Sequence, residues 1–241
     1  MRGEEPAGQP SPGSLSGPDA RARAKGYRGV AMEGPIARWY ARTRGSAPQI
    51  AAWKRQAGEL AKGLPSRAEV LEVAPGPGYF SVELARLGSV RVSALEISHT
   101  FVQIARDNAR RAGVRLTVEQ GDAAAMPFAD GAFDLVVCQA AFKNFSRPQA
   151  AVNEMYRVLK SSGAALIEDM RHDASNDAIR EEVRAMRIGP VRSFFTRQAL
   201  RGLRRRAYTA AQFEEFARRS PFQGCGIVPT ALALEVRLSK S

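Results

Sequence analysis

One segment sets the architecture: Glu69-Val70-Leu71-Glu72-Val73-Ala74-Pro75-Gly76-Pro77-Gly78. Its first half, residues 69–74, is short and mostly apolar, which is typical of a buried strand. The prolines and glycines that follow indicate a tight turn. Apolar residues then recur at helical intervals from Tyr79 to Leu87. The segment therefore predicts a strand, a turn and a helix in immediate succession.

The same alternation continues along the chain. Further strands are expected where short apolar runs recur, at 90–97, 114–120, 133–139 and 164–170. Between them we expect a helix that opens at Ser98, a good N-cap, and ends near Gly113. Another helix is expected between Pro148 and Lys160, with Gly163 as its stop. Strands that alternate with helices form a parallel sheet covered on both faces, so the sequence predicts a doubly wound α/β fold.

The C-terminal part departs from this alternation. Residues 174–206 are expected to form inserted helices, and Thr209-Ala210-Ala211-Gln212 resembles a capping box that starts the next helix. The runs 225–228 and 232–238 lie too close together for a parallel crossover, which needs a dozen or more residues. They predict a terminal antiparallel hairpin that completes a mostly parallel seven-stranded, Rossmann-like sheet.

Length and composition favour one domain with appendages. The 241 residues are 44% hydrophobic and 25% charged, as in ordinary globular proteins. Residues 1–25 are expected to be a flexible tail, and the domain would occupy 26–241, with a helical cap over about 32–64. No apolar run reaches the roughly 20 residues that span a bilayer, and no secretory signal is recognisable. A cytoplasmic protein is therefore expected.

The net charge of +12 is unevenly distributed, since residues 180–206 hold nine arginines against two glutamates. A basic surface can indicate nucleic acid, an anionic membrane or an acidic substrate as a partner. The same excess of arginine is also explained, without any such partner, by solvated helix faces and a codon bias towards arginine.

Small residues occupy the turn after the first strand, at Ala74, Gly76 and Gly78. Ligands of open α/β sheets bind beyond the carboxyl ends of the strands, and small residues allow the backbone to approach them closely. A dinucleotide fingerprint would place its third glycine on Tyr79, so the spacing argues against a pyrophosphate loop.

The spacing fits instead the E/D-x-G-x-G-x-G loop of class I S-adenosylmethionine-dependent methyltransferases, which the chain resembles from about Val70 to its end. Glu96 closes the second strand 24 residues after Glu72, and Gly121-Asp122-Ala123 follows the third. Residues 133–137 and 154–163 resemble the family's fourth-strand motif and its turn before strand five.

The resemblance implies S-adenosylmethionine as cofactor. In the family, the acid at the position of Glu96 accepts both ribose hydroxyls, and the acid at that of Asp122 binds the adenine amino group. The residues expected to bind the cofactor are Glu72, Ala74, Gly76, Gly78, Glu96, Ile97, Asp122, Ala123 and Gln139.

Two departures from the family pattern concern the branch and the acceptor. Ala74 replaces the first glycine, which the ubiquinone and menaquinone methyltransferase branch tolerates, and this branch is the one that the chain most resembles. Residues 139–145 stand where that branch often has aromatic and histidine residues, which leaves the acceptor chemistry open.

Transfer to an oxygen or carbon acceptor requires a base, for which His172, at the end of strand five, is the best candidate and Lys143 a weaker one. No metal is expected, because two histidines and two cysteines offer no credible ligand set. Cys138 lies in a buried strand and is expected to be a core residue rather than a nucleophile.

Three hypotheses on function remain open. The first is methyl transfer to a small hydrophobic or aromatic acceptor, covered by a two-sided lid made of 32–64 and 174–206. The second is an RNA methyltransferase, which the charge favours and the lack of a recognisable RNA-binding appendage disfavours. The third is a catalytically silent partner subunit that binds the cofactor.

Overall fold

The computed structural model describes residues 26–28 and 32–241, so the tail expected at 1–25 lies outside the described residues. The strands are β1 (Ala68–Val73), β2 (Val90–Glu96), β3 (Thr117–Gln120), β4 (Phe133–Gln139), β5 (Leu159–Met170), β6 (Gly226–Pro229) and β7 (Ala233–Ser239). The helices are α2 (Gly34–Arg44), α3 (Ala47–Lys62), α4 (Tyr79–Arg86), α5 (His99–Ala112), α6 (Pro148–Val158), α7 (Asn176–Ala185), α8 (Pro190–Arg204) and α9 (Ala210–Arg218), with a short 3-10 helix, η2 (Phe142–Asn144).

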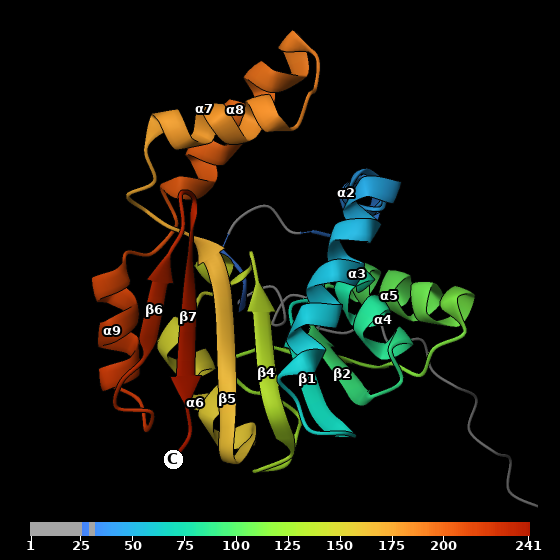
Figure 1. Cartoon of the computed structure of the whole chain (residues 1–241), viewed down its shortest axis with the longest axis vertical. Coiled ribbons are helices and arrows are strands. Elements are labelled where there is room, and N and C mark those ends of the chain that lie inside the picture. The colour runs from blue at the N-terminus through green and yellow to red at the C-terminus, as the bar shows by residue number, and fades with distance from the viewer. Residues whose placement is uncertain (1–25, 29–31) are drawn as a thin grey trace, which may run out of the picture.

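The strands form one seven-stranded sheet in the order β3-β2-β1-β4-β5-β7-β6 (Figure 1). Strand β1 lies inside the sheet, next to the central strand β4, and pairs in parallel with β2 on one side and β4 on the other. The chain reverses only at the far edge, where β7 runs antiparallel to both β5 and β6. The predicted fold class, including the terminal hairpin, is confirmed.

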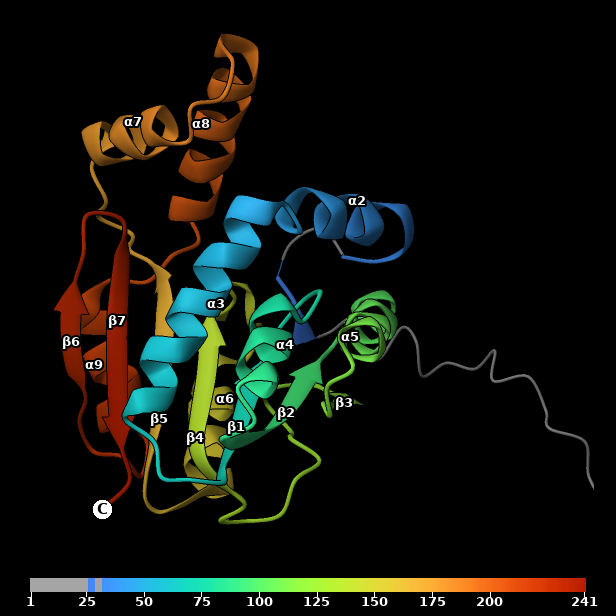
Figure 2. The ribbon, with the colours of Figure 1, turned by 45° about the vertical axis from the view of Figure 1, so that its right-hand side comes forward.

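Helices cover both faces of the sheet (Figure 2). Because side chains alternate along a strand, Val70 packs with Phe80 and Leu84 under α3 and α4, whereas Leu71 packs in the cluster under α6 and α9. The central strands are therefore buried on both faces, as the apolar runs predict.

Two helix starts follow the sequence signals. The Ser98 hydroxyl accepts a hydrogen bond from the Phe101 amide at the start of α5, and Gly113 ends that helix in a left-handed conformation. At α9, Thr209 and Gln212 form the complete capping box. Each device satisfies backbone amides that the first helical turn leaves without a partner.

The prediction for Gly163 is wrong. Helix α6 ends at Val158, and Leu159 already has the extended conformation with which β5 begins. Strand β5 pairs with β4 at Leu159 and again from Ala164, with a register shift between the two points. Gly163 lies within this irregular stretch, where a β-carbon would come 3.0 Å from the Asp134 carbonyl oxygen. The glycine thus allows a close approach of two strands. The predicted bounds of the third strand also differ from the structure, because β3 covers only Thr117–Gln120 of the predicted 114–120.

Helices α7 and α8 form a hairpin that projects beyond the carboxyl ends of the strands (Figures 1 and 2). At its base, Met170, Ile179 and Ala207 are buried together, with Leu200, Leu203 and Leu232 packed against them. Helix α8 itself contains no buried residue. Over residues 26–28 and 32–241, no helix is long and apolar enough to cross a membrane.

Candidate active site

A large cavity of about 1880 Å³ opens at the carboxyl ends of the strands. Its floor is made by the loops that follow β1, β2, β3 and β4, and by the end of β5. Residues of α2, α3, α7 and α8 line its sides. The cavity therefore lies where open α/β sheets bind their ligands.

The loop after β1 bends through left-handed backbone conformations at Ala74, Gly76 and Gly78, with φ of 58°, 57° and 73°. A β-carbon at Gly78 would lie 2.8 Å from the β-carbon of Ala105 in α5, which leaves no room for a side chain. A β-carbon at Gly76 would meet nothing closer than 4.0 Å. Gly78 is thus required by helix packing, whereas Gly76 presents bare backbone to the cavity.

Glu96 ties this loop to the end of β2. Its side chain is only 4% exposed, and its two carboxylate oxygens accept hydrogen bonds from the amides of Gly76 and Ser98, each at 2.9 Å. Glu72 is equally buried and accepts a hydrogen bond from the Ser81 hydroxyl. Both carboxyl groups line the cavity, so they are not exposed strand-end acids.

Burial disfavours the charged form of both groups and raises the pKa of Glu72 and of Glu96 to about 7. The hydrogen bonds from Ser81 to Glu72, and from Ser98 and Gly76 to Glu96, oppose this shift. Each carboxylate also retains acceptor capacity, which a donor in the cavity can use.

Asp122 follows β3 and lies beside an N-terminal residue that the sequence analysis missed. A β-carbon at Gly26 would come 2.7 Å from the Asp122 carboxylate and 2.6 Å from Ile97. Arg147 forms an ion pair of 2.8 Å with Asp122. Gly26, Ile97, Asp122 and Ala123 all line the cavity at its β2–β3 side.

Residues 26–28 are held against the η2 segment. Tyr27 forms a bridge with Phe145, the Arg28 amide donates to the Asn144 carbonyl at 2.6 Å, and the Ser146 amide donates to the Gly26 carbonyl at 3.1 Å. Because these partners lie more than 100 residues away in the sequence, no local pattern could have indicated the contact.

Lys143 is buried, and its ammonium group forms an ion pair of 2.6 Å with Asp169 and donates to the Ala140 carbonyl. The Asp169 carboxylate also accepts from the Lys143 amide at 2.7 Å. This pair joins the end of β5 to the segment after β4. Both residues also line the cavity, and removing either partner of this buried pair would leave the other charge without compensation.

Two amide side chains beside this pair have oxygen atoms without a hydrogen-bond partner among the described residues. They are Oε1 of Gln139 and Oδ1 of Asn144. Both residues line the cavity, and Asn144 is only 8% exposed. Buried polar atoms normally have partners, so these oxygens are suited to accept hydrogen bonds from a ligand.

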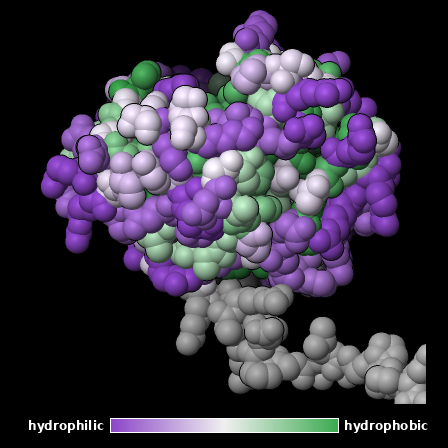
Figure 3. Space-filling model, turned by 90° about the horizontal axis from the view of Figure 1, so that it is seen from below, coloured by the Kyte–Doolittle hydropathy of each residue, from purple (hydrophilic) through white to green (hydrophobic). Residues whose placement is uncertain are grey.

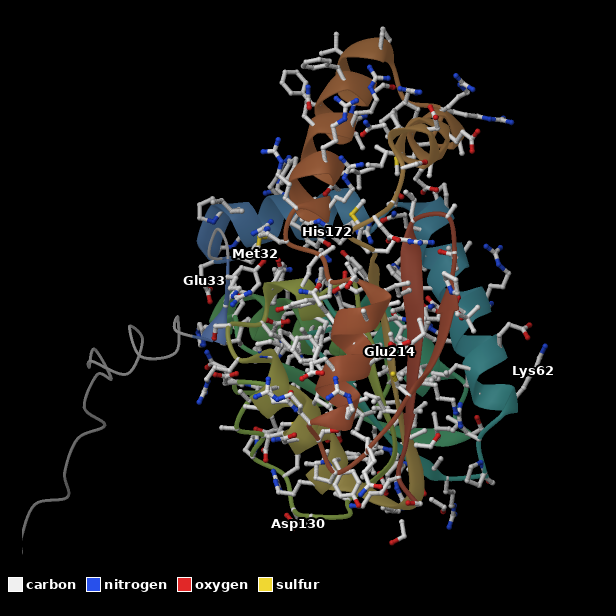
Figure 4. The ribbon with its side chains drawn as sticks, turned by 90° about the vertical axis from the view of Figure 1, so that its left-hand side faces the viewer. Met32, Glu33, Lys62, Asp130, His172 and Glu214 are labelled. Carbon is white, nitrogen blue, oxygen red and sulfur yellow. The ribbon has the colours of Figure 1, made fainter. Side chains whose placement is uncertain are left out.

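His172 is exposed and is not among the residues that line the cavity. Its Nδ1 lies 3.1 Å from the Arg204 carbonyl, near the base of the α7–α8 hairpin (Figure 4). Glu168, four residues earlier on β5, does line the cavity and accepts a hydrogen bond from Gln56 at 3.1 Å. Glu168 is exposed, but partial desolvation of its carboxyl group and the nearby Glu235 raise its pKa.

Glu33 is a further residue that sequence reasoning missed (Figure 4). Its carboxylate accepts hydrogen bonds from the amides of His99 and Thr100, at 2.8 and 3.0 Å, and from the Thr100 hydroxyl. A negative charge at the start of a helix is favoured by the helix dipole. Glu33 therefore fastens the N-terminal end of α2 to α5 at the edge of the cavity.

Within residues 26–28 and 32–241, no group of three or more His, Cys, Asp or Glu side chains is placed to hold a metal ion. Cys138 is fully buried in the core, and burial raises the pKa of its thiol.

Comparison with known proteins adds independent information. Residues 71–167 match the model of a methyltransferase domain family. A demethylmenaquinone methyltransferase of Thermus thermophilus is 34% identical over 117 residues, which cover 48% of this chain and 52% of that protein. A ubiquinone/menaquinone biosynthesis C-methyltransferase of Haemophilus ducreyi is 33% identical over 119 residues, covering 48% and 46%. The chain thus aligns with about half the length of these relatives.

Among solved structures, an S-adenosylmethionine-dependent methyltransferase fold from Methanococcus maripaludis superposes with a TM-score of 0.69. The match covers 89% of this chain and 96% of that one at 20% identity, and it shows the shared fold. The resemblance to S-adenosylmethionine-dependent methyltransferases, predicted from the sequence, is confirmed.

The strained loop predicts opposite effects for two substitutions. Ala74→Gly should raise the free energy of unfolding by up to about 1 kcal/mol, because a left-handed conformation is costly for every residue except glycine. Gly78→Ala should lower it by about 1 to 3 kcal/mol, through the same backbone strain and the clash with Ala105. Urea denaturation of both variants measures the difference, and a destabilised Ala74→Gly variant would contradict the conformation described.

The buried glutamates predict a pH dependence of stability in the ligand-free protein. Because the pKa values of Glu72 and Glu96 are raised from 4.5 to about 7 on folding, the native state binds their protons more tightly than the unfolded state. Their contribution to the free energy of unfolding should therefore fall as the pH rises from about 4.5 to about 7. Thermal melts between pH 5 and 8 test this. In a Glu72→Gln, Glu96→Gln variant, this part of the pH dependence should vanish.

Proposed function

We propose that the chain transfers a methyl group from S-adenosylmethionine to a small hydrophobic, aromatic acceptor. The observation that carries the proposal is the buried Glu96 carboxylate, held by the amide of Gly76 at the floor of a large cavity. It lies within the segment that matches the methyltransferase domain family.

Several residues of the cavity would contact the cofactor. Glu96 would accept the ribose hydroxyls, and Asp122 with the Ala123 amide would bind the adenine ring beside Ile97. The bare backbone at Gly76 would face the methionine part, with Glu72 and the unpaired Gln139 oxygen as further acceptors, whereas Gly78 does not line the cavity. Arg147 would have to release Asp122, or share it, when the adenine amino group binds. When bound, the cofactor supplies an electrophilic sulfonium methyl group.

The acceptor would occupy the outer part of the cavity, whose walls are rich in apolar side chains. Trp39, Tyr40, Trp53, Phe145, Leu200 and Leu203 are among them. The names of both relatives refer to quinones, which supports a quinone-like, aromatic acceptor for this chain. The protein's main contribution would be to align the acceptor and exclude water, because the methyl donor is already reactive.

Residues 32–64 and 174–206 would act as the two sides of a lid over this part of the cavity. Both sides contribute lining residues, Ile36 from α2 and Met186 from the α7–α8 connection among them. Few residues of α2, α3 and α8 are buried, so these helices are held less firmly than the sheet. A lid must open for the acceptor to enter, which such weakly held elements permit.

A proton must leave the acceptor when an oxygen or an activated aromatic carbon is methylated. The proposed base is Glu168, because it lines the cavity and its raised pKa would make it a better proton acceptor. His172 remains the alternative, provided that the hairpin turns its ring inward.

Two other functions compete with this proposal. An RNA methyltransferase would bind single-stranded or structured RNA with strong salt dependence, because each neutralised phosphate releases counterions. A silent partner subunit would bind the cofactor without turnover. The decisive experiment measures S-adenosylhomocysteine formation with a panel of phenols, hydroquinones and RNA. Turnover with an aromatic compound alone supports the proposal, turnover with RNA alone replaces it, and cofactor binding without turnover favours the silent subunit.

The assignment of Glu96 predicts a loss of cofactor affinity. Glu96→Gln removes the charge that strengthens hydrogen bonds from two hydroxyl groups, each worth roughly 1.5 to 3 kcal/mol. The dissociation constant for S-adenosylmethionine should rise by about tenfold or more in calorimetry. Glu83→Gln on α4 is the matched control and should leave the affinity unchanged, because Glu83 does not line the cavity. Unchanged affinity in Glu96→Gln, or tighter binding of NAD than of S-adenosylmethionine, would refute the assignment.

The proposal that Glu168 is the base predicts different methyl-transfer rates for substitutions of Glu168 and His172. Glu168→Gln should lower the rate of methyl transfer by about 100-fold while leaving cofactor affinity within a few fold, because general bases typically contribute 10²- to 10⁴-fold. His172→Gln should retain most of the activity. Single-turnover rates of both variants at several pH values measure this, and the reverse order of effects would transfer the role to His172.

A further inference from the structure

The exposed apolar side chains of the protein gather at one end. Large exposed hydrophobic residues over 26–28 and 32–241 are Ile36, Trp39, Leu87, Met186, Val191, Phe194, Phe195 and Val228. Six of the eight belong to α2 or to the α7–α8 hairpin, at the end where the cavity opens. Figure 3 shows the opposite end of the molecule, where hydrophilic side chains predominate. The end where the cavity opens therefore carries most of the exposed apolar side chains, and we call the opposite end of the molecule the polar pole.

The first half of α8 carries the most exposed of these residues. Val191 is 69% exposed, Phe194 50% and Phe195 65%. They stand at positions i, i+3 and i+4, so they form one stripe along the helix. The two rings pack edge to face, with centroids 5.6 Å apart, and form a single apolar wedge.

Arginines flank this stripe on both sides. At about 100° per residue, Arg192 lies about 60° beyond Phe195, and Arg197 about 60° beyond Phe194 on the other side. Arg184 and Arg187 add positive charge from the adjoining turn and the end of α7. We define the docking surface as Arg184, Arg187, Val191, Arg192, Phe194, Phe195 and Arg197.

We propose that this docking surface binds the face of a lipid bilayer that carries anionic headgroups. An apolar stripe bordered by arginines matches the boundary between acyl chains and headgroups, where rings enter the hydrocarbon and guanidinium groups reach the phosphates. Each arginine near an anionic membrane surface adds to the attraction. The hairpin projects from the body of the protein, so its tip reaches a flat surface without obstruction (Figures 1 and 4).

The other occupants fit this surface less well. A second copy placed symmetrically on it would bring two arginine clusters face to face, which costs energy. RNA would pair with the arginines, but the stripe of one valine and two phenylalanines offers no hydrogen-bonding group for base edges. The surface also cannot be explained by packing within the chain, because α8 has no buried residue.

The docking surface lies on the same hairpin that forms part of the cavity wall. Met186, Leu200 and Leu203 of the same hairpin line the cavity, and the two leucines lie on the side of α8 away from the stripe. If the proposed function holds, a hydrophobic acceptor dissolved in the bilayer would enter the cavity from the membrane side without crossing water. The docking itself does not depend on that function, because it rests on the outer face of the hairpin.

Vesicle flotation of the full-length chain tests the proposal. The probes are vesicles of phosphatidylcholine alone and of phosphatidylcholine with about one third phosphatidylglycerol. We expect binding to the anionic vesicles only, weakened by salt. The double variant Phe194→Ser, Phe195→Ser should bind at least about tenfold more weakly, since it loses the wedge. The double variant Arg192→Gln, Arg197→Gln should also bind more weakly and lose much of the salt dependence.

Matched controls come from the polar pole. Leu87→Ser removes an exposed apolar side chain at the end of α4, and Arg110→Gln with Arg111→Gln removes two exposed charges at the end of α5. Neither should alter vesicle binding. Thermal melts and S-adenosylmethionine affinity of each variant report on folding and on the cofactor site separately from vesicle binding.

Several results would overturn the proposal. The first is a wild type that does not bind anionic vesicles. The second is a pair of α8 variants that bind as well as the wild type, and the third is control variants that lose as much vesicle binding as the α8 variants. If the wild type binds a 30-nucleotide single-stranded RNA but no vesicles, and the α8 variants lose this RNA binding, the surface is assigned to RNA. A dimer that the phenylalanine variant dissociates, again without vesicle binding, would assign it to a second copy.

Discussion

The candidate site depends on one buried carboxylate. Glu96 accepts one amide hydrogen bond from the glycine loop after β1 and another from the start of α5, each at 2.9 Å. Without it, two backbone amides at the floor of the cavity would lose their partners, at a cost of about 1 to 3 kcal/mol each. The same carboxylate therefore shapes the loop and remains available to a ligand. Its pKa of about 7 reflects the cost of burying a charge there, which binding energy from a ligand can offset.

The sequence predicted those parts of the fold that local patterns determine. Helix caps at Ser98 and Thr209 follow from hydrogen bonds within three residues, and the terminal hairpin follows from the shortness of the connection. The boundary between α6 and β5 was missed because Leu159 continues the apolar spacing of the helix. Only pairing with Phe133 on β4, a tertiary contact, sets Leu159 in the strand.

The cofactor residues could be predicted better than the catalytic ones. Glu72, Glu96 and Asp122 each follow from a strand end, and strand ends are visible in the sequence. The acids at the end of β5 are also visible in the sequence as a group, but the direction of each side chain is not. In the structure Asp169 turns inward to Lys143, Glu168 lines the cavity and His172 lies outside its lining. The contact of Gly26 with Asp122 and that of Glu33 with α5 join distant parts of the chain and leave no local signal.

The two halves of the cavity are built in different ways, and this difference bears on how the protein works. The floor rests on β1, β2 and β4, whose side chains are buried on both faces and whose loops are held by hydrogen bonds. The walls come from helices with few buried residues, and the α7–α8 hairpin meets the sheet at a small cluster around Met170, Ile179 and Ala207. An element held only at its base turns about that base more readily than it unfolds. Any surface that binds the tip of the hairpin would restrict this rotation, and the restriction would act on Leu200 and Leu203 in the cavity wall. Under the two proposals above, binding at the outer face of α8 would therefore affect the opening of the cavity, although no residue of the docking surface lines the cavity.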